Sequence, residues 1–243
     1  MQETVMKKID LGHFKFNLYE STSHSEGKPK VLFYHGWGMN VDHYHDVGKE
    51  IAKGGYTTII PELIYHDTRT PLKNPFNYKN MQNYFWKTIF YSIDEFDQFI
   101  DTVGIQNDKI ILVGSSMGGF IASGIFSKNI YLKGLANING SGSFLLTEKI
   151  FRQKDGRQKV TKDEELVFVK YDPIGRNNGE GPVLLLNGDS DETIPLEGNK
   201  DYYYFLTEQE RKNNVEFRVY PNINHQFTDE MFKDFLTWLN QFN

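Results

Sequence analysis

The sequence predicts an α/β protein with a largely parallel sheet that is covered by helices on both faces. Four-residue apolar runs such as Val31–Tyr34 and Val183–Leu186 are typical of strands buried on both sides. Segments with helical periodicity lie between these runs, and this alternation favours parallel strands. The 243 residues, 39% of them hydrophobic, suffice for one large core, and no internal repeat is evident. We therefore expect a single domain over residues 1–243.

The first third of the chain contains three predicted strands. Phe14–Tyr19 alternates apolar and polar residues, which indicates a half-exposed strand. Val31–Tyr34 is followed by a predicted helix over Val41–Lys53, which two glycines close. The third strand, Thr57–Ile60, stops at a proline, and we expect a long loop from Glu62 to Asn80.

The clearest helix in the sequence follows this loop. Apolar side chains recur at spacings of four and three and form one stripe: Phe85, Ile89, Ile93, Phe96, Ile100 and Val103. Gly104 then supplies the residue type that commonly ends a helix. One helix is therefore expected along the whole stripe.

The second half of the chain continues the alternation. Strands are expected at Ile110–Val113, Leu135–Asn139, Val183–Leu186 and Phe217–Tyr220. Helices are expected over Gly198–Lys212 and at the C-terminus, where an apolar stripe includes Phe227, Met231, Phe235, Leu239 and Phe242. The segment of about 141–181 is polar and weakly periodic, so we expect a small cap insertion with one or two short helices.

Composition excludes several classes of function. The net charge is -5 and no basic cluster stands out, which argues against a nucleic-acid partner. Cysteine is absent, so there is no disulfide, thiol nucleophile or thiolate metal site. No apolar run approaches membrane-spanning length and Met1–Lys8 shows no secretory signal, so we expect a cytoplasmic protein without a membrane span.

A glycine-flanked serine follows the strand at Ile110–Val113. Gly114-x-Ser116-x-Gly118 stands between that strand and an apolar segment beginning at Phe120, which is the pattern of a nucleophile elbow. The glycines leave room for a serine in a strained backbone conformation, and the helix directs its positive end at the site. Such a short motif recurs by chance, so an ordinary glycine-rich turn stays open on this motif alone.

Backbone donors for an oxyanion can be assigned beside this serine. A serine that attacks a carbonyl needs N–H groups aimed at the developing negative charge. Met117, the residue after Ser116, supplies one candidate. Trp37, in the glycine-containing loop after Val31–Tyr34, supplies the other, with a plain strand-ending turn as the alternative.

An acid and a base follow two further strands, at the sheet edge where α/β proteins place reaction centres. The pattern Gly188-x-x-Asp191-x-x-Ile194-Pro195 favours Asp191 as the acid, with Asp189 as a turn-capping residue. His225, in the loop before the last helix, is the candidate base. The chain order Ser116, Asp191, His225 is that of the α/β hydrolases.

Several other polar and aromatic residues have simpler interpretations than a functional one. His43, His45, His66 and Asp67 match no metal motif, so solvated positions are favoured and no metal site is expected. Aromatic residues could line an acyl pocket, although about half of them are more simply core: Phe76, Tyr78, Tyr84, Phe85 and Trp86.

With these residues the chain resembles α/β hydrolases of the prolyl-oligopeptidase-like and dienelactone-hydrolase-like branch, and is similar to compact bacterial carboxylesterases of the YjfP type. The resemblance runs from Phe33-Tyr34-His35-Gly36 to the C-terminal helix. It implies a mostly parallel sheet of about eight strands, a small cap, and hydrolysis of short-acyl esters without a cofactor. It also implies a nucleophile, an acid, a base and two oxyanion donors: Ser116, Asp191, His225, and Trp37 with Met117.

The expected function is therefore that of a serine carboxylesterase acting on a small-molecule ester, as a monomer or homodimer. Dienelactone hydrolases proper use a cysteine, which this chain lacks, and this argues against that activity. The same triad could serve a thioesterase, a deacetylase or a small-peptide hydrolase. A hydrolase-shaped binding protein without catalysis is the alternative from another class.

Overall fold

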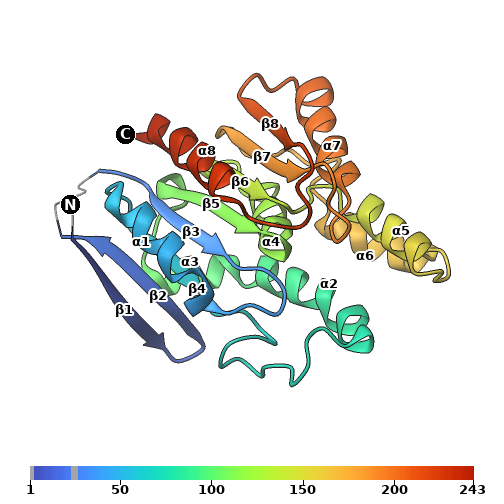
Figure 1. Cartoon of the computed structure of the whole chain (residues 1–243), viewed down its shortest axis with the longest axis horizontal. Coiled ribbons are helices and arrows are strands. Elements are labelled where there is room, and N and C mark those ends of the chain that lie inside the picture. Colours follow the sequence, from blue (N-terminus) through green and yellow to red (C-terminus); the bar gives the residue numbers. More distant parts are fainter. Residues whose placement is uncertain (1–2, 23–26) are drawn as a thin grey trace.

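A computed structural model describes residues 3–22 and 27–243 and shows one central sheet of eight strands (Figure 1). Their order across the sheet is β1-β2-β4-β3-β5-β6-β7-β8. The strands are β1 (Thr4–Leu11), β2 (Phe14–Ser21), β3 (Lys30–Tyr34), β4 (Thr58–Pro61), β5 (Ile110–Ser115), β6 (Gly134–Ile138), β7 (Val183–Gly188) and β8 (Val215–Tyr220). From β4 to β8 all neighbours pair in parallel, while β2 pairs antiparallel with β1 and β4. The predicted, largely parallel sheet is confirmed, with β1 as an additional strand.

Helices cover both faces of this sheet, as expected. They are α1 (His45–Lys53), α2 (Tyr78–Asp94), α3 (Phe96–Val103), α4 (Met117–Phe126), α5 (Phe144–Lys154), α6 (Lys162–Tyr171), α7 (Leu196–Tyr204) and α8 (Asp229–Leu239). Figure 1 shows α1 and α8 in front of the sheet, where they pack with Val31 and Phe33. The alternate residues Leu32 and Tyr34 face the opposite core, which contains apolar side chains of α2, α3, α4 and α7. The period of two in the strands thus separates two cores.

The long helix predicted after the loop is broken in two. α2 begins at Tyr78, where Asn77 Oδ1 accepts a hydrogen bond from the backbone N–H of Lys79. The helix ends at Asp94, and α3 runs from Phe96 to Val103 and is closed by Gly104, whose φ is 72°. Glu95 lies at the break, and its carboxylate accepts hydrogen bonds of 2.8 and 2.7 Å from the Arg69 guanidinium. The break therefore coincides with a contact to the loop before α2. A local pattern of apolar residues carries no information about such a contact.

Other boundaries differ by a few residues. A 3-10 turn over Val41–Tyr44 precedes α1, and α7 gives way to a π-helical turn over Phe205–Gln209. α8 begins at Asp229, because Thr228 accepts a hydrogen bond from the Met231 N–H as its cap, so Phe227 lies before the helix.

The segment between β6 and β7 contains two helices, α5 and α6. They lie next to each other beyond the ends of the strands (Figure 1, yellow). α6 begins with a capping box, in which Thr161 and Glu164 satisfy each other's backbone N–H groups. The insertion thus stands at the carboxyl edge of the sheet, close to the loops that follow β3, β5, β7 and β8.

Candidate active site

Ser116 occupies a strained turn between β5 and α4. Its φ is 56° and its ψ is -122°, a conformation that side-chain-bearing residues rarely adopt. A Cβ atom on Gly114 would lie 2.0 Å from the carbonyl oxygen of Gly118, and one on Gly118 would lie 2.0 Å from that of Tyr34. Both glycines are therefore required by close backbone packing. The Ser116 N–H donates to Ile138 O at 2.8 Å, which fixes the turn against β6.

The structure brings Ser116, His225 and Asp191 together in a chain of hydrogen bonds. His225 Nε2 lies 2.8 Å from Ser116 Oγ, and His225 Nδ1 lies 2.7 Å from Asp191 Oδ2. The Asp191 side chain is fully buried, whereas 24% of the His225 side chain is exposed. A base lies between a hydroxyl and a carboxylate, which is the arrangement needed to activate the hydroxyl.

The two candidate aspartates occupy different positions. The second carboxylate oxygen of Asp191 accepts hydrogen bonds of 2.8 Å from the N–H groups of Thr193 and Ile194, which orient the carboxylate. Asp189 is exposed, and its Oδ1 accepts from the Asn222 N–H at 2.7 Å. The structure therefore places Asp191 next to the histidine and Asp189 in a turn.

The loop after β3 lies against the serine. A Cβ atom on Gly36 would lie 3.3 Å from Ser116 Cβ, so the backbone around Trp37 borders the hydroxyl. The Trp37 side chain donates to Pro75 O at 3.1 Å, which ties this loop to the long loop before α2. Met117 is the first residue of α4, where an N–H has no acceptor within the helix. Both predicted donors thus border the site.

A buried polar cluster that the sequence did not indicate supports the Trp37 loop. His35 Nε2 lies 3.0 Å from Asp67 Oδ2, and the other oxygen of Asp67 accepts from the Val41 N–H at 2.8 Å. His66 Nε2 accepts a hydrogen bond of 3.0 Å from the N–H of Gly38. Burial, together with the neighbouring His35, lowers the pKa of His66 to about 4, so this ring is a neutral acceptor at neutral pH.

The expectation that His66 and Asp67 are solvated is therefore wrong. His66 is 4% exposed and the Asp67 side chain is 3% exposed. His43 is exposed, as expected. The only local signal for this cluster is a histidine directly after a buried strand, at His35.

Asn139 is a second residue that sequence reasoning missed. It follows β6 with a φ of 50° and lies against the cavity beside Ser116. Its side-chain amide donates to Gln226 O at 2.6 Å, and its Oδ1 accepts from the Gly188 N–H at 3.2 Å. Asn139 therefore links the ends of β6 and β7 to the loop that contains His225.

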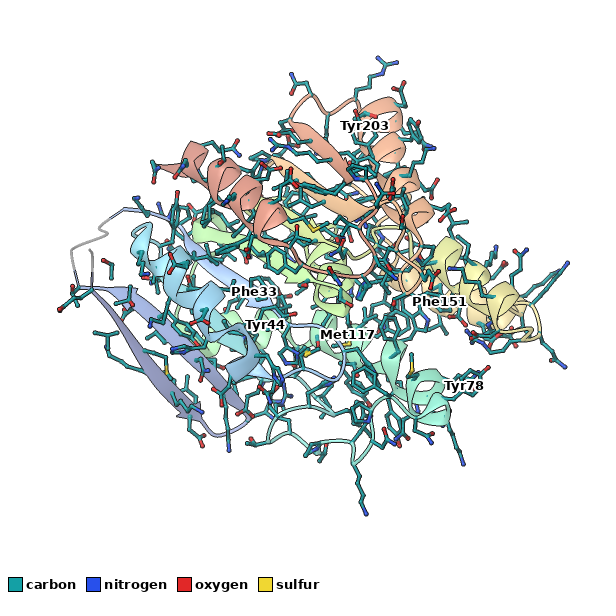
Figure 2. All side chains as sticks on the ribbon, in the orientation of Figure 1. Phe33, Tyr44, Tyr78, Met117, Phe151 and Tyr203 are labelled. Atoms are coloured by element: carbon teal, nitrogen blue, oxygen red, sulfur yellow. The ribbon has the colours of Figure 1, made fainter. Side chains whose placement is uncertain are left out.

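A cavity of about 660 Å³ opens beside Ser116 and His225. Four of the five aromatic residues that the sequence offers for an acyl pocket line it: Phe76, Tyr78, Phe85 and Trp86. Tyr84 instead packs against Tyr65, with ring centroids 4.7 Å apart. Phe151 of α5 completes the wall, and Figure 2 shows Phe151 and Tyr78 on the same side of the molecule.

Two further observations concern residues 3–22 and 27–243. No helix there is both long and apolar enough to span a bilayer. Within the same ranges, no three histidine, cysteine, aspartate or glutamate side chains are grouped as metal ligands.

Comparisons with known proteins agree with this architecture. Residues 16–234 match the dienelactone hydrolase family. Esterase YjfP of Escherichia coli (strain K12) is 23% identical over 227 residues, which cover 88% of each chain. Among solved structures, TT1662 from Thermus thermophilus has a TM-score of 0.73 at 17% identity and covers 99% of this chain and 98% of its own. An acetyl xylan esterase from Paenibacillus sp. R4 has a TM-score of 0.66 at 14% identity and covers 100% of this chain and 90% of its own.

Proposed function

This chain belongs to the dienelactone hydrolase family and has the α/β-hydrolase fold, and on this basis we propose that it is a serine carboxylesterase cleaving short-acyl esters. One observation carries the proposal. The imidazole of His225 lies 2.8 Å from the hydroxyl of Ser116 and 2.7 Å from the carboxylate of Asp191. Ser116 itself stands at a strained strand-to-helix turn. The esterase name of the YjfP relative supports an ester as the substrate.

In the proposed mechanism, Ser116 Oγ attacks the ester carbonyl while His225 Nε2 accepts the hydroxyl proton. Asp191 accepts the hydrogen bond from Nδ1–H and stabilises the imidazolium that forms. The N–H groups of Trp37 and Met117 stabilise the oxyanion. Collapse of the tetrahedral intermediate breaks the ester C–O bond, and His225 gives its proton to the departing alcohol. A water molecule deprotonated by His225 then hydrolyses the acyl-enzyme.

The same chemistry could cleave thioesters, acetylated sugars or small peptides. A panel of acyl donors separates these classes, because a pocket selects the group that fills it. Dienelactone hydrolysis is not proposed, since the chain has no cysteine. A binding protein that has lost catalysis is disfavoured, because all three triad side chains are present and in contact. We further propose that residues 1–243 form one domain, with the insertion at about 141–181 as a cap.

Labelling by a fluorophosphonate and turnover of p-nitrophenyl acetate test the proposal. Ser116→Ala should abolish labelling and lower kcat by a factor on the order of 10⁴ to 10⁶. Ser115→Ala is the matched control, because Ser115 directly precedes Ser116, whereas the hydrogen bonds of the His225 ring go to Ser116 and Asp191. Wild-type-like turnover by Ser116→Ala, or labelling that disappears only in Ser115→Ala, would refute the assignment.

A further inference from the structure

We propose that the ester cleaved at Ser116 has a bulky, apolar alcohol part, aromatic or of medium chain length, which binds between α2 and the insertion. The inference rests on the proposed function, in which the acyl group is short. It assigns the part of the cavity that a short acyl group leaves empty to the alcohol part of the ester. Four features of the described residues lead to it: the size of the cavity, its aromatic wall, its exposed mouth and its paired charges.

The cavity is larger than a short acyl group needs. Its volume of about 660 Å³ lies in the middle of the range, about 300 to 1,000 Å³, in which proteins enclose drug-sized molecules. An acetyl or propionyl group held at Ser116 would fill a small part of that space. The remaining volume then accommodates the alcohol part of the ester.

The wall of the cavity is a connected row of aromatic rings. The rings of Trp37 and Phe85 meet edge to face at 5.9 Å, and those of Phe85 and Phe151 do so at 6.1 Å. The row therefore starts at the loop that borders Ser116 and ends on α5 of the insertion. An alcohol leaving the ester bond would lie along these rings.

The mouth of the cavity exposes large apolar side chains. Phe76 is 60% exposed and Tyr78 is 55% exposed, and both line the cavity. Met39 and Met81 line it too, each 38% exposed. Apolar side chains that gather on a concave surface are typical of a binding site, because an apolar ligand removes them from water. A sugar or glycerol would leave most of this surface without a matching partner.

The charged residues of the lining already have partners or lie at the exposed rim. Glu148 Oε1 accepts from Arg157 at 2.9 Å, and Arg157 also donates to Asp155 at 3.0 Å. Lys154 and Glu192 are exposed. Among residues 3–22 and 27–243, the buried side-chain atoms without a hydrogen-bond partner belong to residues outside the lining. In the described part of the chain, the wall therefore has no buried side-chain polar atom that needs a hydrogen bond from a hydroxyl-rich alcohol.

Two series of unactivated esters test the inference. In the first, the acyl group stays acetyl and the alcohol changes from ethanol to hexanol, 2-phenylethanol and glycerol. We expect kcat/KM to rise by about tenfold or more from ethyl to 2-phenylethyl acetate, with glycerol acetate no better than ethyl acetate. In the second series, from ethyl acetate to ethyl hexanoate, no comparable rise is expected. A flat first series, or a rise in the acyl series alone, would overturn the inference.

Two tyrosines on α2 provide a matched pair of variants. Tyr78 and Tyr91 are 55% and 56% exposed, but only Tyr78 lines the cavity. Tyr78→Ser should lower the preference for 2-phenylethyl over ethyl acetate by about fivefold or more. Tyr91→Ser should leave that preference unchanged. Equal effects of the two changes would mean that the cavity mouth does not select the alcohol.

Binding to Ser116→Ala separates this inference from the proposed chemistry. Calorimetry should show that 2-phenylethyl acetate binds this variant about tenfold more tightly than ethyl acetate. If the wild type hydrolyses no ester but this preference is present, the proposed function fails, and what remains is a cavity that binds an apolar group without the assignment to an ester alcohol. If esters are hydrolysed but the two acetates bind equally, the inference fails and the proposed function stands.

Discussion

The side-chain amide of Asn139 donates a hydrogen bond of 2.6 Å to the carbonyl oxygen of Gln226, the residue after His225. Asn139 is anchored in turn by the Gly188 N–H, which donates to its Oδ1 at 3.2 Å. The position of the proposed base therefore depends on a side chain that follows a different strand. Asn139 is a positioning residue, because its contacts reach the histidine loop and do not involve the reacting atoms.

Asn139→Gly should lower kcat by about 10- to 100-fold with little change in KM, because a small displacement of the base disturbs proton transfer more than substrate binding. Glycine suits the φ of 50° at this position, so the change removes the side-chain hydrogen bonds, including those to Gln226 and Gly188, without adding backbone strain. Asn222→Gly is the control, since Asn222 is exposed and has a φ of 59°. Equal kcat values for both variants would exclude the positioning role.

The two aspartates after β7 should differ strongly in their effect on activity. Asp191→Asn should lower kcat by about 10⁴-fold, because an amide cannot stabilise the imidazolium and favours the wrong tautomer of His225. Asp189→Asn should change kcat by less than about tenfold, since Asp189 caps a turn on the surface. Steady-state kinetics of the two purified variants gives the comparison. The opposite order would move the acid to Asp189.

His66 should make the fold sensitive to acid. Burial and the neighbouring His35 lower its pKa from 6.5 to about 4, so the unfolded chain binds a proton in this window that the folded chain does not. The free energy of unfolding therefore decreases as the pH falls from about 6.5 to about 4, by up to roughly 3 kcal/mol from this residue.

Urea unfolding of the wild type and of His66→Gln, at pH 7 and at pH 4.5, measures this contribution. Glutamine can accept from the Gly38 N–H as His66 does but does not titrate. The variant should lose less stability between the two pH values than the wild type. Identical losses would show that His66 is not the group that responds.

Glu148 should matter for stability more than a surface acid on the same pair of helices. Its carboxylate is 3% exposed and accepts from Trp86 Nε1 at 2.7 Å and from Arg152 Nε at 2.6 Å. Glu148→Ala leaves a buried indole N–H without its partner and two arginines without one of theirs. We expect a loss of about 2 to 4 kcal/mol.

Glu165→Ala provides the comparison. Glu165 of α6 pairs with Lys149 of α5 at 2.8 Å, but the two side chains are 39% and 49% exposed. Its removal should cost less than about 1 kcal/mol, because exposed pairs are weakened by solvent. Urea denaturation midpoints of both variants measure the two losses of stability. Similar losses for Glu148→Ala and Glu165→Ala would show that burial does not make the Glu148 contacts more important.

Much of the fold could be predicted because each central strand is a continuous apolar run bounded by turn residues. The edge strand β1 escaped this reasoning. Lys7 and Lys8 interrupt the alternation in β1, and only the pairing of β1 with β2 makes it a strand. The break at Glu95 likewise coincides with a contact to Arg69, which is 26 residues away in the chain. Local patterns do not contain such tertiary contacts.

The residues of the site also fall into two groups, those that local sequence patterns indicate and those that they do not. Ser116, Asp191 and His225 could be proposed because each follows a strand in a recognisable local pattern. His66 and Asn139 could not be proposed, because their roles depend on backbone groups that come close only in the folded chain. A histidine or asparagine in a loop has the same local appearance whether it is solvated or buried.

The backbone strain at Ser116 has a consequence for how such a protein can change over time. A φ of 56° with a ψ of -122° costs roughly 1 to 3 kcal/mol for a serine, and glycine would relieve part of it. With Ser116 as the proposed nucleophile, selection for thermal stability and selection for turnover would act in opposite directions at this one residue. A related protein that no longer depended on the proposed activity could gain stability through a single Ser-to-Gly substitution at this position. An inactive descendant would then be recognised by an altered elbow within an otherwise intact fold.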